Sequence, residues 1–262
     1  MQFTASVQQV IKYRNGQVQR EPGHIAAEYP LTIYVNGDEF ATLVCTPSDL
    51  KEMVVGFLAS EGVIRFYHEI NQLEIDVKQG LAYVELNRSV HQVKDFYAKR
   101  VIGSCCGKSR QSFYFYSDLR TAKTIRTAPS IPIQTCFDLM KRLQEKSAAF
   151  KTTGGVHNAA LCTPEKLVIM RTDIGRHNAL DKLYGHTLIN GISTADKIIA
   201  FSGRISSEVL LKVSKIGVGI LLSKSAPTDL ALQMANDLNV TTVGFIRNDE
   251  LNIYTHPERI LL

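Results

Sequence analysis

The chain has 262 residues, of which 45% are hydrophobic and 21% charged, and its formal net charge is +5. This length and composition predict one large or two modest globular domains with a buried core, and they exclude a disordered or low-complexity chain. The mild positive charge is spread along the sequence and suits nucleic acid, a phosphate-bearing small molecule or an acidic partner protein; the positions of the arginines favour the small molecule.

The N-terminus and the cysteine count indicate the compartment. Residues 1–6 contain neither the basic nor the apolar run of a signal peptide, and no stretch approaches the ~18 consecutive apolar residues of a membrane span. The five cysteines are odd in number, so a disulfide framework is not expected. We therefore expect a cytoplasmic protein with reduced thiols and no membrane segment.

The first part of the chain is predicted to be rich in β-strands. Residues 31–35 and 40–44 alternate apolar and polar side chains, and Asn36-Gly37 between them is typical of a hairpin turn. A helix is expected to begin at Pro47 with Thr46 as its N-cap.

A second hairpin is predicted from residues 73–77 and 81–86, and a helix from an apolar stripe over 133–149. A boundary near residues 151–155 would divide the chain into a β-rich α+β part (1–150) and an α/β domain (151–262). The first part is also compatible with an elaboration on one common core.

From residue 157 the pattern changes to alternating strands and helices. The last three predicted strands are short apolar runs with a helix between each pair, which indicates an α/β layer with a parallel sheet. Strands are expected at 159–162, 167–171, 197–201, 218–222 and 241–246, and helices near 178–188, 206–215 and 227–238.

The adjacent cysteines Cys105 and Cys106 are the most unusual feature of the sequence. Glycines flank them, and Lys108 and Arg110 would lower the thiol pKa by favouring the thiolate. A thiolate in a basic loop suits persulfide chemistry. A cysteine can instead be a small buried core residue, and this is the interpretation for the other cysteines. The spacing of the cysteines gives no support to a metal site. Those other cysteines are Cys45, Cys136 and Cys162.

Polar and basic residues follow the predicted strands of the C-terminal part. Carboxyl ends of parallel strands share one edge of a sheet, and helix N-termini there bind anions, so we expect a phosphate-containing ligand. Neither a P-loop nor a Gly-x-Gly-x-x-Gly motif is present. His157 either contacts the ligand or is a loop histidine whose hydrogen bonds are made within the protein. The candidate residues are Asp173, Arg176, His177, Ser202, Gly203, Arg204, Ser223, Lys224, Arg247 and Asn248.

With these residues in view, the chain resembles the FdhD/NarQ family of formate dehydrogenase accessory sulfurtransferases over nearly its whole length. The most specific strings are FLASEG at 57–62, GGVHNAA at 154–160, DIGRHNALDK at 173–182, FSGR at 201–204 and SKSAP at 223–227.

The resemblance implies a sulfur carrier. A cysteine desulfurase would load a persulfide onto the protein, which would pass the sulfur to bis-molybdopterin guanine dinucleotide (Mo-bisMGD) destined for the formate dehydrogenase apoprotein. It also implies a homodimer, a C-terminal domain similar to the cytidine deaminases, and guanine nucleotides as mimics of the cargo. The family's guanine-dinucleotide segment corresponds here to Phe245, Ile246, Arg247, Asn248, Asp249 and Glu250.

One departure from the family concerns the cysteines. Many members carry Cys-x-x-Cys, whereas Cys105 and Cys106 are adjacent, so either remains the candidate persulfide carrier. Deaminase chemistry is disfavoured because its zinc signature is missing. Two other functions stay open: a chaperone that binds the molybdenum cofactor without moving sulfur, and a nucleotide-dependent hydrolase.

Overall fold

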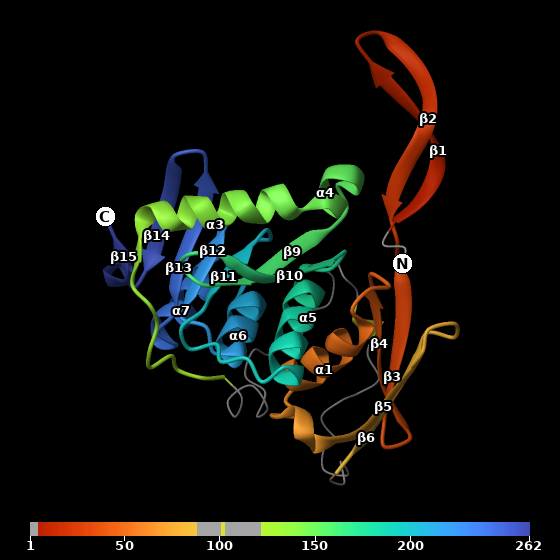
Figure 1. Ribbon diagram of the computed structural model, residues 1–262, viewed down its shortest axis with the longest axis horizontal. Helices are drawn as coiled ribbons and strands as arrows, with labels where there is room; N and C mark the ends of the chain where they lie inside the picture. Colours follow the sequence, from red (N-terminus) through yellow and green to blue (C-terminus); the bar gives the residue numbers. More distant parts are fainter. Residues whose placement is uncertain (1–4, 88–100, 103–121) are drawn as a thin grey trace.

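The computed structural model describes residues 5–87, 101–102 and 122–262; Cys105 and Cys106 lie outside these ranges. The first part is β-rich, as predicted (Figure 1). Its elements are β1 (Ala5–Arg14), β2 (Gln17–Ala26), β3 (Tyr29–Val35), β4 (Asp38–Cys45), α1 (Leu50–Ser60), η1 (Tyr67–Glu69), β5 (Ile70–Asp76), β6 (Leu81–Leu86) and β7 (Val101–Ile102).

The first two strands form a hairpin that projects from the body, and the others form a sheet in the order β5-β6-β3-β4-β7. The predicted hairpin of β3 and β4 is confirmed. Asn36 and Gly37 both have positive φ, 50° and 84°, the conformation that a two-residue hairpin turn requires. The second predicted hairpin is β5 and β6.

The C-terminal part contains a six-stranded sheet in the order β10-β9-β11-β12-β13-β14. The predicted parallel pairing of β11, β12 and β13 is confirmed. Both β10 and β11 pair antiparallel with β9, so β10 runs in the same direction as the parallel strands. The elements are β8 (Ile131–Pro132), α3 (Ile133–Lys146), α4 (Ala148–Thr153), β9 (His157–Cys162), β10 (Leu167–Asp173), α5 (Arg176–Ile189), β11 (Ile198–Phe201), α6 (Ser207–Ile216), β12 (Ile220–Ser223), α7 (Asp229–Asp237), β13 (Thr241–Arg247), β14 (Glu250–Thr255), η3 (Pro257–Arg259) and β15 (Ile260–Leu261).

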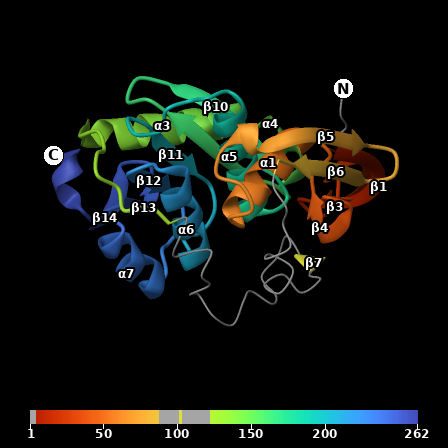
Figure 2. The ribbon, with the colours of Figure 1, turned by 90° about the horizontal axis from the view of Figure 1, so that it is seen from below.

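Helices cover both faces of this sheet. Helix α3 packs on one face, and α5, α6 and α7 lie on the other (Figures 1 and 2). The strands are buried on both sides: Ile198 and Ala200 of β11 face the cluster under α3, whereas Ile199 and Phe201 face the opposite cluster. This alternation explains why the strands read as continuous apolar runs. No helix in the described ranges is both long and apolar enough to span a membrane.

The N-terminal and C-terminal parts meet where α1 crosses α5. A Cβ atom on Gly56 would lie 1.7 Å from the carbonyl oxygen of Asp181, and one on Gly185 would lie 1.9 Å from that of Glu52. The two helix backbones can therefore approach this closely only because both positions are glycine. One hydrophobic cluster includes residues from both sides of position 150. The division into domains at that position stays a prediction.

The structure differs from the predicted elements in several places, of which three bear on the site or the sheets. Helix α1 begins at Leu50 rather than at Pro47, with Asp49 as its N-cap residue, because Thr46 is held by Asp173 instead. The expected helix over 133–149 is broken at Ser147 into α3 and α4. The antiparallel edge strand β14 was not predicted, although the positive φ of Asn248 (48°) favours the turn before it.

Candidate functional site

The predicted site residues lie at one edge of the C-terminal sheet. Because β10, β11, β12 and β13 run in the same direction, their carboxyl ends meet at this edge, which we call the rim. Side-chain and backbone hydrogen bonds connect its loops. Ser202 Oγ accepts from Asn158 N at 2.9 Å, and Ser223 Oγ donates to Gly203 O at 2.8 Å. The rim is therefore one connected surface rather than four separate loops.

Asp173 anchors the first loop of the rim. Its side chain is fully buried, and Oδ2 accepts hydrogen bonds from Thr46 N and Oγ1, both at 2.9 Å, and forms an ion pair with Lys182 at 2.7 Å. Oδ1 accepts from Gly175 N at 2.8 Å and from Asn178 Nδ2 at 2.9 Å. These partners occupy both carboxylate oxygens, so the carboxylate holds the loop in place, and the role of Asp173 in cofactor binding stays a prediction.

Arg176, His177 and His157 form the basic part of the first loop. Arg176 and His177 open helix α5, and His157 opens β9 opposite Asp173. Burial lowers the pKa of His157, and the positive charges of Arg176 and His177 lower it further. The neutral imidazole is therefore favoured near pH 7. The role of His157 stays a prediction.

Glu208 is a rim residue that the sequence analysis did not single out. Its Oε2 lies 3.1 Å from His177 Nε2, an ion-pair distance, and this contact with His177 holds the pKa of Glu208 below its usual value. The carboxylate therefore stays ionised and orients the His177 ring. Position 208 follows Ser206, the N-cap of α6, in a first turn where acidic residues are common, so the sequence contained no distinctive signal.

The second and third loops of the rim, which follow β11 and β12, combine close packing with exposed basic side chains. A Cβ on Gly203 would lie 3.2 Å from Arg176 Cβ and 2.9 Å from the Phe201 ring, so glycine allows the first and second loops to meet. Arg204 and Lys224 are both exposed. The rim therefore presents cations around a tightly packed centre.

The fourth loop holds an aromatic side chain in a strained conformation. Phe245 has φ of +53°, which is uncommon for a residue other than glycine, at an irregularity in the β13–β14 ladder. The residue is 39% exposed, and the Arg247 guanidinium lies 5.8 Å from the ring centroid. A residue keeps such a backbone conformation only where the surrounding structure holds it in place. Residues of this kind cluster at ligand-binding sites.

The rest of the predicted segment after Phe245 divides between core and surface. Ile246 is buried in the cluster under α3, so its side chain faces away from the rim. Asn248 forms the turn of the β13–β14 hairpin, and Asp249 and Glu250 are exposed beside it. Only the backbone of Ile246 is available to a ligand at the rim.

The cysteines in the described ranges are unreactive. Cys45, Cys136 and Cys162 are buried free thiols, as predicted, and burial raises the pKa of each to about 12. Such thiols remain protonated near neutral pH and are poor nucleophiles. The predicted sulfur-carrying residues Cys105 and Cys106 lie outside the described residues, so their role stays a prediction.

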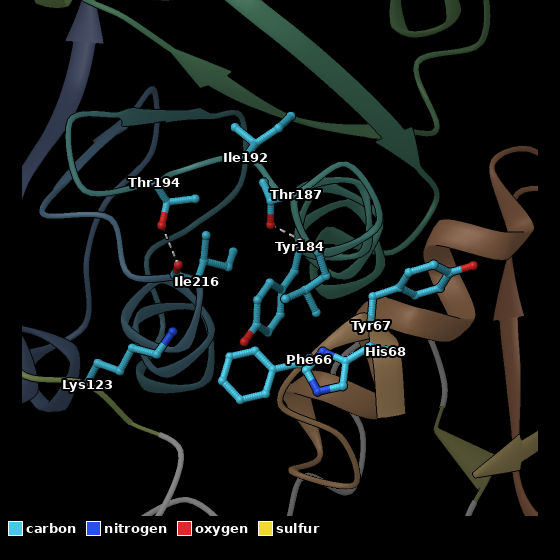
Figure 3. A pocket seen from close by; sticks show the side chains of 11 residues that line it. Phe66, Tyr67, His68, Lys123, Tyr184, Thr187, Ile192, Thr194 and Ile216 are labelled. Carbon is cyan, nitrogen blue, oxygen red and sulfur yellow. Dashed lines mark hydrogen bonds between the residues drawn. The ribbon is translucent and has the colours of Figure 1, made fainter. Parts of the chain in front are cut away.

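A separate pocket lies near the C-terminal end of α5, away from the rim (Figure 3). Its volume is about 300 Å³, and Phe66, Tyr184 and Lys123 are among its lining residues. None of the predicted site residues that lie in the described ranges lines it. Burial lowers the pKa of Lys123.

Comparison with known proteins decides the family. The model of the FdhD/NarQ family matches residues 26–261. The chain belongs to the FdhD/NarQ family. Two relatives are named sulfur carrier protein FdhD: the protein from Halalkalibacterium halodurans is 60% identical over 98% of this chain and 95% of its own length, and that from Bacillus subtilis is 58% identical over 97% of both.

A solved structure supports the same assignment. A protein from Desulfotalea psychrophila, assigned as a formate dehydrogenase accessory protein, is 26% identical and superposes with a TM-score of 0.79. The match covers 98% of this chain and 100% of that one. The FdhD/NarQ fold is therefore shared along nearly the whole chain. The expected similarity to the cytidine deaminases stays a prediction.

Proposed function

We propose that this protein is a sulfur carrier that accepts persulfide sulfur from a cysteine desulfurase at Cys105 or Cys106. It then passes the sulfur to Mo-bisMGD, the cargo destined for formate dehydrogenase. The observation that carries the proposal is the match, at 60% identity over 98% of the chain, to a relative named as a sulfur carrier. The structure also makes Cys45, Cys136 and Cys162 poor candidates for the sulfur-carrying residue, because they are buried and protonated near neutral pH.

The rim is the proposed binding site for the guanine dinucleotide of the cargo. Its first two loops open the helices α5 and α6, whose N-terminal N–H groups attract phosphate. The basic side chains of Arg204, Lys224 and Arg247 add positive charge, and the exposed Phe245 ring offers a surface on which a base can stack. The combination of helix N-termini, cations and an exposed ring favours a nucleotide over a simple anion.

Intact-mass analysis tests the sulfur-carrier proposal. We expect the wild-type protein to gain sulfur after incubation with a desulfurase and free cysteine, and the double variant Cys105→Ala/Cys106→Ala to gain none. The single variants identify the acceptor. Cys162→Ala is the matched control and should gain sulfur as the wild type does, because its thiol is buried.

The alternative is a chaperone that binds the molybdenum cofactor without moving sulfur. A wild-type protein that gains no sulfur but binds guanine nucleotides would favour this alternative. Full activation of a formate dehydrogenase by the double cysteine variant would also contradict the sulfur-carrier proposal.

A further inference from the structure

The pocket of Figure 3 lies at the opposite end of α5 from the rim. Helix α5 has 14 residues, so at about 1.5 Å per residue its two ends are about 20 Å apart. The pocket volume of about 300 Å³ is at the lower end of the range for small-molecule sites. The pocket is therefore a candidate site separate from the rim, with room for a ligand much smaller than a dinucleotide.

The walls of the pocket are mainly aromatic and aliphatic. Leu188 and Ile216 provide aliphatic surface, and Phe66 provides a large apolar ring although the residue is 58% exposed. This ring stacks on the His68 ring, with the centroids 5.4 Å apart and the planes 8° from parallel. The backbone N–H of Phe66 donates to Glu69 Oε1 at 2.9 Å. The Phe66 ring is therefore held in place at the pocket, where a planar group can pack against it.

Tyr184 places an unpartnered hydroxyl group among these apolar side chains. The residue is 6% exposed, and its hydroxyl is directed into the pocket (Figure 3). Burial, and after it the charge of Asp181, raises the pKa of Tyr184 to about 12, so the hydroxyl keeps its proton near neutral pH. Within residues 5–87, 101–102 and 122–262, no group forms a hydrogen bond with this hydroxyl. Because buried tyrosine hydroxyls usually have a partner, the hydroxyl indicates a ligand that accepts a hydrogen bond.

Lys123 brings a positive charge to the same pocket. Its backbone N–H donates to Ser214 Oγ at 2.9 Å, and that hydroxyl donates to the Lys123 carbonyl at 2.8 Å, so the backbone position is fixed. A Cβ on Gly217, at the C-terminal end of α6, would lie 3.8 Å from Lys123 Nζ. No carboxylate in the described part of the chain forms an ion pair with this ammonium. The ammonium is therefore available to an anionic ligand.

We propose that this pocket binds a small aromatic monocarboxylate. The carboxylate accepts hydrogen bonds from Lys123 Nζ and Tyr184 Oη, and the ring packs against Phe66 and the aliphatic side chains. One lysine and one free hydroxyl match one carboxylate, whereas a pyrophosphate carries more charge than the described lining residues neutralise. A lysine that only balanced the dipole of α6 would leave the buried Tyr184 hydroxyl without a partner. The inference is independent of the proposed sulfur transfer.

Ligand-observed NMR titration of the full chain with phenylacetate tests the proposal. Phenylacetamide has nearly the same shape without the charge, so comparison of the two compounds isolates the contribution of the carboxylate. We expect phenylacetate to bind with a Kd on the order of 1 mM, and phenylacetamide to bind at least about tenfold more weakly. An excess of GDP should leave phenylacetate binding unchanged, because the rim is at the other end of α5.

Lys123→Met and Tyr184→Phe each remove one polar group and nearly retain the size of the side chain. Each should weaken phenylacetate binding roughly tenfold or more, and Lys123→Met should leave phenylacetamide binding unchanged. The matched controls are Lys78→Met and Tyr13→Phe, at exposed positions outside the pocket, and they should bind phenylacetate as the wild type does. Tyr184→Phe should also keep the wild-type free energy of unfolding in urea, because it removes a hydroxyl that has no partner in the described ranges.

Four outcomes of the titrations would overturn the proposal: no binding of phenylacetate at tens of millimolar, equal affinity for phenylacetamide, displacement of phenylacetate by GDP, or wild-type affinity in Lys123→Met or Tyr184→Phe. A loss of the same size in the two control variants would place phenylacetate outside this pocket. A marked loss of stability in Tyr184→Phe would show that the hydroxyl already has a partner within the protein, which also contradicts the proposal.

Discussion

Lys182 Nζ lies 2.7 Å from Asp173 Oδ2, and both side chains are completely buried. The ammonium also donates to Thr46 Oγ1 at 2.6 Å and to the Thr46 carbonyl at 3.2 Å. This one cation therefore connects the end of β4, in the N-terminal sheet, to the first loop of the rim.

Replacement of Lys182 by Met should strongly destabilise the protein, because it leaves the Asp173 carboxylate buried without its counter-charge. The expected loss in the free energy of unfolding is about 3–5 kcal/mol, measured by urea denaturation. Lys224→Met, at an exposed rim position, is the control and should change the stability little. The double variant Lys182→Met/Asp173→Asn should recover part of the loss; a double variant as unstable as the single one would contradict the explanation.

Gly56→Ala and Gly185→Ala should each destabilise the protein through the crossing of α1 and α5. A glycine-to-alanine change within a helix normally stabilises by about 0.5–1 kcal/mol. Here the added methyl group would meet a carbonyl oxygen at 1.7 Å or 1.9 Å, so the helices must separate and the sign reverses. We expect a loss of at least ~2 kcal/mol for each variant by thermal or urea denaturation.

Gly155→Ala is the comparison for these two variants. Its nearest contact is the Ala26 side chain at 3.2 Å, which needs to shift by only a few tenths of an ångström. If Gly56→Ala were as stable as Gly155→Ala, the close approach of the two helices would not be required for the fold.

Glu52 should make the stability depend on pH in the acid range. Burial opposes its ionisation, but hydrogen bonds from Arg171 and His186 outweigh burial and hold the pKa of Glu52 below its usual value near 4.5. Because the pKa is lower in the folded state, the carboxylate stabilises the fold fully above about pH 4.5. This contribution is lost as pH falls through the folded-state pKa.

The measurement is the free energy of unfolding in urea from pH 7 down to pH 3.5. Glu52→Gln should be less stable than wild type at pH 7, and the difference should shrink as the pH falls below about 4.5. Glu85→Gln, at an exposed position, is the control and should retain the wild-type profile. A constant difference between Glu52→Gln and wild type at every pH would show that the ionised carboxylate is not what stabilises the fold.

Phe245→Gly should separate ligand binding from stability. Glycine adopts the φ of +53° without strain, which offsets part of the stability lost with the partly buried ring, so the free energy of unfolding should change little. Loss of the ring should weaken GDP binding by about 0.5–1.5 kcal/mol if the base stacks on Phe245. Isothermal calorimetry measures the affinity. Phe66→Ala, in the pocket of Figure 3, is the control and should bind GDP as the wild type does.

Arg247→Ala in the same titration should cost about 1.5–3 kcal/mol if its guanidinium meets a phosphate, or roughly ten- to a hundredfold in Kd. Unchanged GDP affinity in both Phe245→Gly and Arg247→Ala would move the nucleotide site away from the rim. Loss of affinity in Phe66→Ala alone would move it to the pocket.

Local patterns in the sequence were sufficient to predict the elements that depend on interactions between residues close in sequence. Asn36-Gly37 between alternating strands predicts the β3–β4 hairpin, and apolar runs separated by helical segments predict the parallel strands β11 to β13. Because parallel strands end at a common edge, the same runs also predict that the loops of Ser202, Ser223 and Arg247 lie together. The family strings include the loops of Ser202 and Ser223.

Contacts between distant residues were decided only by the tertiary structure. Thr46 looked like a helix cap, but its partner is Asp173, 127 residues away. The need for glycine at position 56 depends on the backbone of Asp181, and the positive φ of Phe245 depends on the irregular pairing of β13 with β14. Sequence patterns report the short-range periodicity of a segment, whereas these features arise from the surfaces that two segments present to each other after folding.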